Sequence, residues 1–223
     1  MLLTRYFYFG EFSRFEQQLR SYASEERHFE RGEHLCRPSE LLDSVFYIEN
    51  GMTLLSILHE SGDEDAICYW GSGDIVPLVV EEQRLSLESS MLLRAVAETT
   101  VLRLSPQAMK QAMLDCPELA VAAVNRYTRY ANMLLFSRVT AHHEPPLTRL
   151  ASFLYSYLRY LPNERNAIEL SQGEIASVLG MSRASVARAL TALKKEDVVS
   201  TSRGKVCVLD VDGLEAHLSR CMR

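Results

Sequence analysis

The stretch from residue 171 to residue 209 constrains the fold most, because it carries two helix starts in close succession. Ser171 and Glu174 form an S-x-x-E capping box, which predicts a helix that begins directly after the serine. Gly180 follows as the C-terminal stop, since glycine adopts a left-handed backbone at little cost. Ser182 is the next N-cap. The sequence therefore predicts two helices joined by a short glycine turn.

The second predicted helix runs from Arg183 to Lys195 and has two unlike faces. At about 100° per residue, its large apolar side chains fall on one side and should pack on the rest of the domain. The opposite side is small, cationic and hydroxyl-bearing, which suits a helix that lies in the major groove of DNA. The residues expected to contact DNA from this two-helix unit are Ser171, Gln172, Ser182, Arg183, Ala184, Ser185, Arg188, Thr191 and Lys195.

Two short β-like segments follow, at 198–201 and 205–209, and the link between them is Ser202-Arg203-Gly204. This hairpin is the wing of a predicted winged helix-turn-helix. Arg203 and Lys205 lie near its tip, where we expect them to contact phosphate. A winged helix used only for protein contacts is the alternative.

Charge is unevenly distributed along the 223-residue chain, whose formal net charge is −5. Between Met181 and Lys205, six basic and two acidic residues give a net charge of +4. Residues 144–223 hold 11 basic and 9 acidic residues, a net of +2, and residues 1–143 hold the remaining 13 and 20, a net of −7. Because local potential decides binding, the C-terminal part favours DNA and the acidic N-terminal part should stay off it.

The stretch GEIASVLGMSRASVARALTALKKEDVVSTSRGKVCVLD resembles the C-terminal domain of the cyclic-AMP receptor protein/fumarate-nitrate regulator (CRP/FNR) superfamily. The S-R-x-[ST]-V-x-R-x-L run at 182–190 is the most specific part of a resemblance that covers nearly the whole chain. In that family an Arg-Glu pair and a later arginine read the DNA half-site. Here Arg183 and Arg188 match, but Ala184 replaces the glutamate. Glutamate accepts a hydrogen bond from cytosine and alanine cannot, so we expect a different half-site.

Residues 28–104 read as short β-strands separated by glycine turns, which predicts a sandwich or barrel. The runs FERGEHL, FYIENGMTLLSILHESGDEDAICYWGSGDIV and RAVAETTVLRLS are similar to the β-roll that binds cyclic nucleotides in the family. The expected turn glycines are Gly32, Gly51, Gly62 and Gly73.

The resemblance breaks at the ligand site. Cyclic-nucleotide binders follow the Gly-Asp turn with a Gly-Glu pair and later an Arg-Ser pair, which hold the ribose and the phosphate. Here Asp74 leads into Pro77-Leu78, and Ser89-Ser90 takes the place of Arg-Ser. An unpaired buried phosphate charge is costly, so we do not expect a cyclic nucleotide. Arg84 and Arg94 are the candidate replacements, although Arg94 is rather expected to face solvent from a strand.

A helix starting at Ser105-Pro106 precedes the longest predicted helix, which runs from Cys116-Pro117 to about Ala141. Its apolar residues cover about half the circumference, more than one packing partner requires. They are Ala120, Val121, Ala123, Val124, Tyr127, Tyr130, Ala131, Leu134, Leu135 and Val139. We therefore infer a parallel homodimer through this helix, as in the family. A core helix of a monomer is the alternative.

In the family this long helix closes the effector pocket. The residues expected at such a pocket here are Tyr69, Trp70, Leu78, Ser89, Ser90, Tyr127, Tyr130, Leu134 and Leu135. They are mostly apolar and aromatic, which indicates a small, weakly polar or aromatic effector. A core filled by its own side chains is the alternative.

Several classes of function are not expected. No apolar run is long enough to cross a bilayer, and the N-terminus does not fit a signal peptide, so we expect a cytoplasmic protein with no membrane partner. The cysteines lack C-x-x-C spacing, and His142-His143 has no supporting ligand, so no metal or other cofactor is expected. No catalytic motif stands out, and an enzyme is not expected.

The predicted fold is α+β: an N-terminal jelly-roll-like double-stranded β-roll at 1–115, a dimerisation helix at 116–143 and a winged helix-turn-helix at 144–223. His142–Pro146 is the expected hinge, because two prolines cannot continue a helix. The predicted function is a transcription regulator that binds a palindromic site on double-stranded DNA, responds to an unknown small effector and contacts RNA polymerase. A constitutive DNA-binding protein with a ligand-free roll is the alternative.

Overall fold

A computed structural model describes residues 6–37, 43–58, 64–78, 90–161 and 165–219, except for the side chains at 90 and 136–142. These residues form two compact units. One comprises residues 8–130, and the other joins residues 1–7 to residues 131–223. The longest helix, α3 (Pro117–His143), therefore begins in the first unit and ends in the second. The predicted three-part division into domains stays a prediction.

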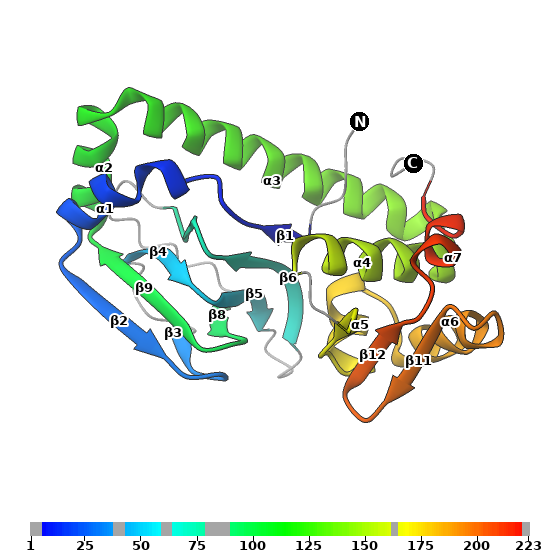
Figure 1. Ribbon diagram of the computed structural model, residues 1–223. Coiled ribbons are helices and arrows are strands. Elements are labelled where there is room, and N and C mark those ends of the chain that lie inside the picture. Colours follow the sequence, from blue (N-terminus) through cyan, green and yellow to red (C-terminus); the bar gives the residue numbers. More distant parts are fainter. Residues whose placement is uncertain (1–5, 38–42, 59–63, 79–89, 162–164, 220–223) are drawn as a thin grey trace. The chain divides into compact units, whose positions relative to one another are not determined.

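Two antiparallel sheets make up the β-roll (Figure 1). The first sheet has the order β1-β6-β5-β8-β3, and the second has the order β2-β9-β4-β7. The strands are β1 (Phe7–Tyr8), β2 (Glu25–Phe29), β3 (His34–Cys36), β4 (Val45–Asn50), β5 (Met52–Leu58), β6 (Glu64–Gly71), β7 (Asp74–Val76), β8 (Ser90–Ala95) and β9 (Thr99–Leu104). The prediction of a roll built from short strands is confirmed.

Predicted glycine turns join these strands at Gly32, Gly51 and Gly73, which all have positive φ angles. Gly51 connects β4 to β5 with φ 97°, and a Cβ atom there would lie 2.3 Å from the carbonyl oxygen of Glu98. A side chain is therefore excluded at this turn by both conformation and space. The fourth predicted turn, at Gly62, lies outside the described residues.

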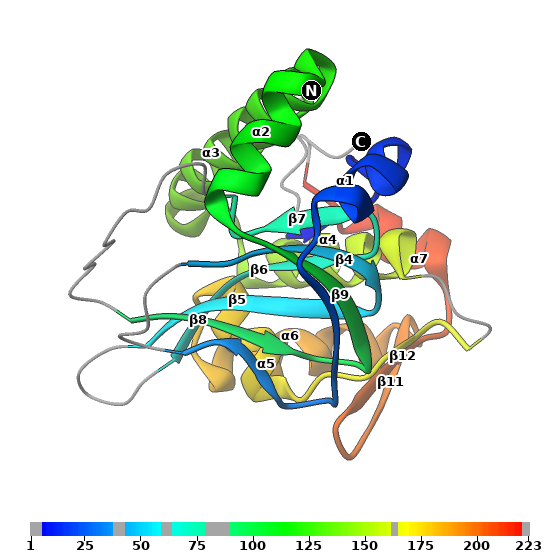
Figure 2. The same cartoon turned by 90° about the vertical axis from the view of Figure 1, so that its left-hand side faces the viewer.

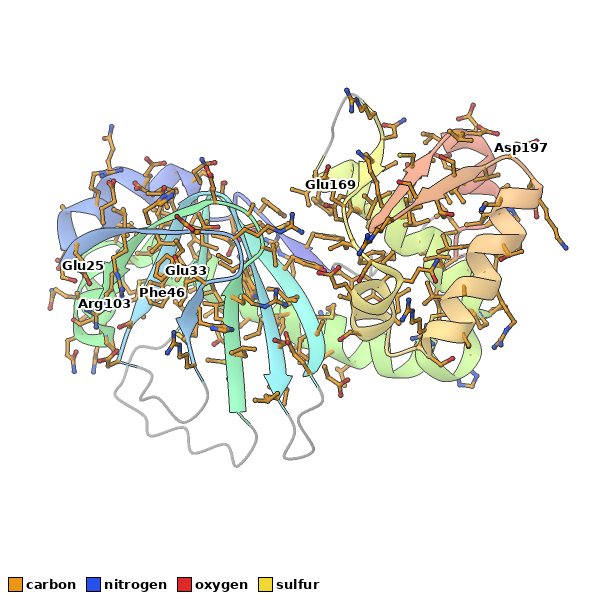
Figure 3. All side chains as sticks on the ribbon, turned by 90° about the horizontal axis from the view of Figure 1, so that it is seen from below. Glu25, Glu33, Phe46, Arg103, Glu169 and Asp197 are labelled. Atoms are coloured by element: carbon orange, nitrogen blue, oxygen red, sulfur yellow. The ribbon has the colours of Figure 1, made fainter. Side chains whose placement is uncertain are left out.

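Between the strands of the second sheet, charged side chains pair on the outer face. Arg103 of β9 lies beside Glu25 of β2, with 3.0 Å between its guanidinium and the carboxylate (Figure 3). On the other sheet, Arg94 was predicted to face solvent, but it is only half-exposed and lies 3.5 Å from Glu64. Arg94 is thus already paired with a carboxylate, and Arg84, the other candidate for a buried phosphate, lies outside the described residues.

Helices cover one end of the roll, where α1 and α2 lie side by side (Figure 2). The N-terminal helical segment consists of a 3₁₀ turn at Ser13–Phe15 and α1 (Glu16–Tyr22). The next helix, α2 (Pro106–Asp115), begins as predicted, with the Ser105 hydroxyl accepting a hydrogen bond from the Ala108 backbone amide.

The N-terminal half of α3 packs on the second sheet through a face that the sequence analysis did not select. Leu119, Ala122, Ala123 and Arg126 are buried there. Of the ten residues predicted as its apolar face, Ala123 alone is buried among those whose side chains are described, and Val139 lies outside that set. Both faces of this helix are apolar, so periodicity could not decide which one meets the roll.

The second unit contains α4 (Pro146–Tyr160), β10 (Ala167–Ile168), α5 (Gln172–Leu179), α6 (Arg183–Lys195), β11 (Val199–Ser202), β12 (Lys205–Val208) and α7 (Val211–Ala216). Its three strands form a small antiparallel sheet in the order β10-β12-β11. The two predicted helices and the wing hairpin are confirmed, with strand ends shifted by one residue. The last helix, α7, starts at Val211, and its last turn carries no basic residue.

The helices of this unit share one apolar core. Leu150, Phe153 and Leu154 of α4 are fully buried, as are Val186 and Leu193 of α6. The helix α4 therefore packs against both helices of the two-helix motif. In the described part of the chain, no helix is long and apolar enough to span a membrane.

Candidate nucleic-acid interface

The start of α5 is fixed by the predicted capping box. The Glu174 backbone amide donates to the Ser171 hydroxyl over 3.2 Å, and the Ser171 amide donates to the Glu174 carboxylate over 2.7 Å. Both residues and Gln172 are half-buried. Because its hydroxyl already caps the helix, Ser171 is placed at the edge of the motif, and its contact with DNA stays a prediction.

The turn between the two helices depends on Gly180, which has φ 55° and ψ 44°, a left-handed conformation. The Met181 backbone amide reaches back to the Ala176 carbonyl over 2.9 Å, which satisfies a carbonyl at the helix end. The chain then passes directly into the next N-cap at Ser182. Glycine thus sets the angle at which α6 leaves α5.

The start of α6 is capped by Ser182, whose hydroxyl accepts from the Ser185 amide over 3.1 Å. Val186, Ala189, Leu190 and Leu193 are buried, as predicted from the helical periodicity. The other side of the helix is open to solvent. Its exposed residues are Arg183, Ala184, Arg188, Thr191, Lys194 and Lys195.

The Arg188 side chain points back toward the start of α6, because its guanidinium donates to the Ser185 hydroxyl over 3.1 Å. Ser185 is in turn 2.9 Å from the Ser182 hydroxyl. This chain of hydrogen bonds orients the arginine along the first turn of α6 before any DNA is present. Thr191 bonds to the backbone, with its hydroxyl donating to the Ala187 carbonyl over 2.8 Å.

The wing is the hairpin of β11 and β12, in which Ser202 pairs with Lys205. Arg203 is exposed at its tip, whereas Lys205 is half-buried and lies 3.6 Å from the Glu169 carboxylate. Glu169 was not considered in the sequence analysis. The exposed Glu169 carboxylate would compete with a DNA phosphate for the Lys205 ammonium, and Lys205 must break this ion pair to contact the phosphate.

Arg149 is a further residue that the sequence analysis missed. From the first turns of α4 its guanidinium donates to the carbonyl of Leu179, the last residue of α5. It thereby ties α4 to the end of α5, next to the Gly180 turn. A cation at a helix C-terminus also complements the helix dipole. The run Pro-Leu-Thr-Arg-Leu gave no signal for this contact, because the partner is a backbone carbonyl 30 residues away.

The roll holds a buried aromatic and charged cluster beneath α3. Tyr8 stacks on Trp70 with 4.6 Å between ring centroids, and Tyr130 of α3 contacts both rings edge-on or tilted. The Arg126 guanidinium lies over the Tyr8 ring, 5.0 Å from its centroid. Burial raises the pKa of the Tyr8 and Tyr130 hydroxyls, so both stay protonated at neutral pH.

Asp74 and Arg126 form a buried ion pair within this cluster. Their side chains are 0% and 2% exposed, and the guanidinium donates to the Asp74 carboxylate. Glu11 is a second carboxylate, 3.7 Å from Arg126 and 2.7 Å from Arg129. Burial raises the pKa of Asp74 to about 7, although the Arg126 charge opposes the shift. Burial also lowers the pKa of Arg126.

The residues predicted for an effector pocket are only partly brought together. Trp70 and Tyr130 meet, and the Tyr127 hydroxyl donates to the Leu78 carbonyl over 3.0 Å. Tyr69 precedes Trp70 on a strand, so its side chain points to the opposite face. The remaining predictions are Leu134 and Leu135, which are exposed, and Ser89 and Ser90, whose side chains lie outside the described set.

Two family models match the chain. Residues 26–116 match the cyclic nucleotide-binding domain, and residues 148–217 match the Crp-like helix-turn-helix domain. Together these matches cover more than two thirds of the chain, in the order roll and then helix-turn-helix. The chain belongs to the CRP/FNR superfamily. It is a DNA-binding transcription regulator of the CRP/FNR type and not an enzyme.

Curated relatives of this CRP/FNR protein are named as transcription regulators. It is 26% identical over 201 residues to the global nitrogen regulator of Synechococcus elongatus, a match that covers 86% of this chain and 88% of the relative. It is 24% identical over 195 residues to the transcriptional activator protein Anr of Pseudomonas protegens, which covers 82% and 76%.

Solved structures of CRP/FNR proteins show the same fold. FixK2 from Bradyrhizobium japonicum superposes with a TM-score of 0.73 at 16% identity, over 87% of this chain and 97% of that one. CprK complexed with OCPA gives a TM-score of 0.69 at 16% identity, over 94% and 97%. The predicted fold class is therefore confirmed.

The described residues contain neither a metal-ligand group nor a disulfide bond. They contain no group of three or more His, Cys, Asp or Glu side chains placed to hold a metal ion. Cys36, Cys68, Cys116 and Cys207 form no disulfide bond with one another, and Cys221 lies outside the described part. Burial raises the pKa of Cys68, which keeps it a thiol at neutral pH.

Proposed function

We propose that this regulator acts as a homodimer that reads a palindromic operator with α6 of each subunit and contacts flanking phosphates with the wing. The observation that carries this proposal is the exposed side of α6. Arg183, Arg188 and Lys195 lie there with hydroxyls and no acidic side chain, opposite a buried face that fixes the helix in its unit. Two such helices about 34 Å apart would enter successive major grooves.

The dimer is proposed to form through the open face of α3. Val121, Val124 and Tyr127 are 60%, 66% and 50% exposed, and Leu114 of α2 is 65% exposed. Large apolar side chains grouped on one helix face favour an interface, because burying them removes apolar surface from water. A twofold axis along α3 would place the same residues of two copies against each other.

Control by a small effector other than a cyclic nucleotide is also part of the proposal. The buried arginine beneath α3 is Arg126, and Asp74 and Glu11 already balance its charge. A cyclic phosphate would have to displace these carboxylates. An aromatic or weakly polar molecule beside Trp70 and Tyr130 meets no such competition. It would act by shifting the population of dimer arrangements.

A constitutive regulator with a filled roll is the second candidate. The observation that favours it is the dense packing of Tyr8, Trp70 and Tyr130, in which Tyr8 is fully buried and Trp70 almost so. In either case the hinge role of residues 142–146, the contact with RNA polymerase and the cytoplasmic location remain predictions.

Selection from a random pool of double-stranded oligonucleotides tests the operator. The expected result is enrichment of an inverted repeat whose half-sites are about one helical turn apart. Enrichment of single half-sites, or of no sequence, would contradict the proposal. Binding to the selected site before and after removal of small molecules by denaturation and refolding then separates the two candidates. A regulator with an effector changes affinity, and a constitutive one does not.

A further inference from the structure

The Asp74–Arg126 pair connects three parts of the chain that are far apart in sequence. Asp74 opens β7, Arg126 lies on the face of α3 that packs on the roll, and Glu11 belongs to the segment between β1 and α1. The backbone amide of Ile75 also donates to Asp74 over 3.0 Å, which fixes the carboxylate on its strand. The pair is thus a buried polar contact between the N-terminal half of α3 and the roll.

The elements packed around Asp74 contribute other titratable groups to the same cluster. They are Tyr8 of β1, Tyr47 of β4, Cys68 of β6, Arg126, Arg129 and Tyr130 of α3, and Glu11. The phenols and the thiol are neutral near pH 7, because burial raises the pKa of each. Asp74 is the fully buried group of this described cluster whose pKa lies near neutrality.

The arrangement tolerates a proton on Asp74. When Asp74 is neutral, the Glu11 carboxylate remains 3.7 Å from Arg126 and 2.7 Å from Arg129. When Asp74 is ionised, Asp74 and Glu11 face both guanidiniums, but the full burial of Asp74 removes the water that would solvate its charge, and this desolvation opposes the ionised form. Protonated Asp74 therefore fits the closed site better than ionised Asp74 does.

We propose that Asp74 and Arg126 are positioning residues for α3, and that binding of a proton at Asp74 determines how firmly α3 is held on the roll. Protonation stabilises the arrangement in which α3 covers Asp74. Deprotonation favours arrangements that admit water to the carboxylate. The inference deepens the proposed function and rests on it, because α3 carries the proposed dimer face.

The pKa of Asp74 supports this direction. Burial raises it from an ordinary value of 3.8 to about 7. By linkage, a group whose pKa is higher in the covered state favours that state as the pH falls. A loosened α3 must be ordered again when the dimer forms on DNA, which weakens operator binding. Operator affinity is therefore expected to fall as the pH rises through neutrality.

The test measures the dissociation constant of the full-length protein for its selected operator between pH 6 and pH 8.5 at constant ionic strength. Asp74→Asn, which mimics the protonated acid, is compared with wild type. The matched control is Glu49→Gln, since Glu49 is a partly buried acid whose arginine partner, Arg20, belongs to α1 rather than to α3. Between pH 6 and pH 8.5, the operator affinity of wild type and of the control should fall. This fall should be on the order of tenfold larger than the fall measured for Asp74→Asn.

Equal pH profiles for wild type and Asp74→Asn would overturn the inference, as would loss of the profile in the control. If Asp74→Asn fails to fold, carbon-13 NMR of wild type labelled at aspartate carboxyls replaces it. An aspartate that titrates near neutrality supports the proposal, and none above about pH 5 contradicts it. Absence of operator binding by every variant at every pH would instead refute the proposed function.

Discussion

At the scale of single residues, Arg188 is the side chain whose removal should affect sequence-specific DNA binding most selectively. Its guanidinium is exposed and oriented by Ser185 along the first turn of α6. Arg188→Ala should cost about 1–3 kcal/mol in binding to the operator and relax one base position. Competition binding with operators mutated at single positions measures this. An equal loss on random DNA would show that Arg188 contacts only the backbone.

Lys205 should behave differently, because it lies near the wing tip and has a carboxylate partner in the free protein. Lys205→Ala should weaken binding to all sequences and lower the slope of log affinity against log salt by about one. Glu169→Gln frees Lys205 and should strengthen binding without changing sequence preference. A base-specific effect of either variant would count against phosphate contact by the wing.

Asp74 should give folding stability a pH dependence of known sign. Its pKa is raised from 3.8 to about 7 in the folded protein, so between these values the folded state binds a proton that the unfolded state does not. The stabilisation is fully present below about pH 3.8 and is lost as the pH rises to 7. In urea titrations at pH 5.5 and 7.5, wild type should lose stability relative to Asp74→Asn. A parallel response of both proteins would contradict the raised pKa.

Residue-scale prediction from sequence worked where the signal was local. Ser171, Glu174, Gly180 and Ser182 could be assigned because caps and glycine turns involve neighbours within a few positions. Arg126 could not, although the spacing of Leu119, Ala122, Ala123 and Arg126 is that of a buried helix face. A lone arginine in such a pattern normally indicates the solvent side, and only the tertiary structure supplies Asp74 as its partner.

At the scale of elements, α3 presents the clearest test. Val124→Glu should place a charge at the centre of the proposed interface, which costs about 3 kcal/mol and raises the dimer dissociation constant about 100-fold. Gln17→Glu on the exposed side of α1 adds the same charge as a control. Sedimentation equilibrium measures both. A dimer that survives Val124→Glu unchanged would move the interface away from this face.

Elements were easier to predict than the faces they present. The bounds of α2, α5 and α6 follow from caps and breakers, and the structure agrees with them. The roll-facing side of α3 could not be chosen, because Leu119 and Ala122 on one face compete with Val121 and Val124 on another. The two faces of α3 are similarly apolar, so only the tertiary structure of the roll determines which face is buried against it.

At the scale of the whole molecule, the chain joins two folding units of unlike charge and unlike chemistry. The order of a β-roll followed by a winged helix was predictable from turn glycines and from the 171–209 motif. The exact line between the units was not, because it falls inside α3, between Tyr130 and Ala131, where the helical pattern is uninterrupted.

That continuity has a mechanical consequence. A single α-helix of 27 residues is about 40 Å long and resists twisting and bending over such a length. Its backbone hydrogen bonds run without interruption from the roll into the first residues of the second unit. A movement of Arg126 against β7 would therefore reach those residues through helical backbone rather than through a loop.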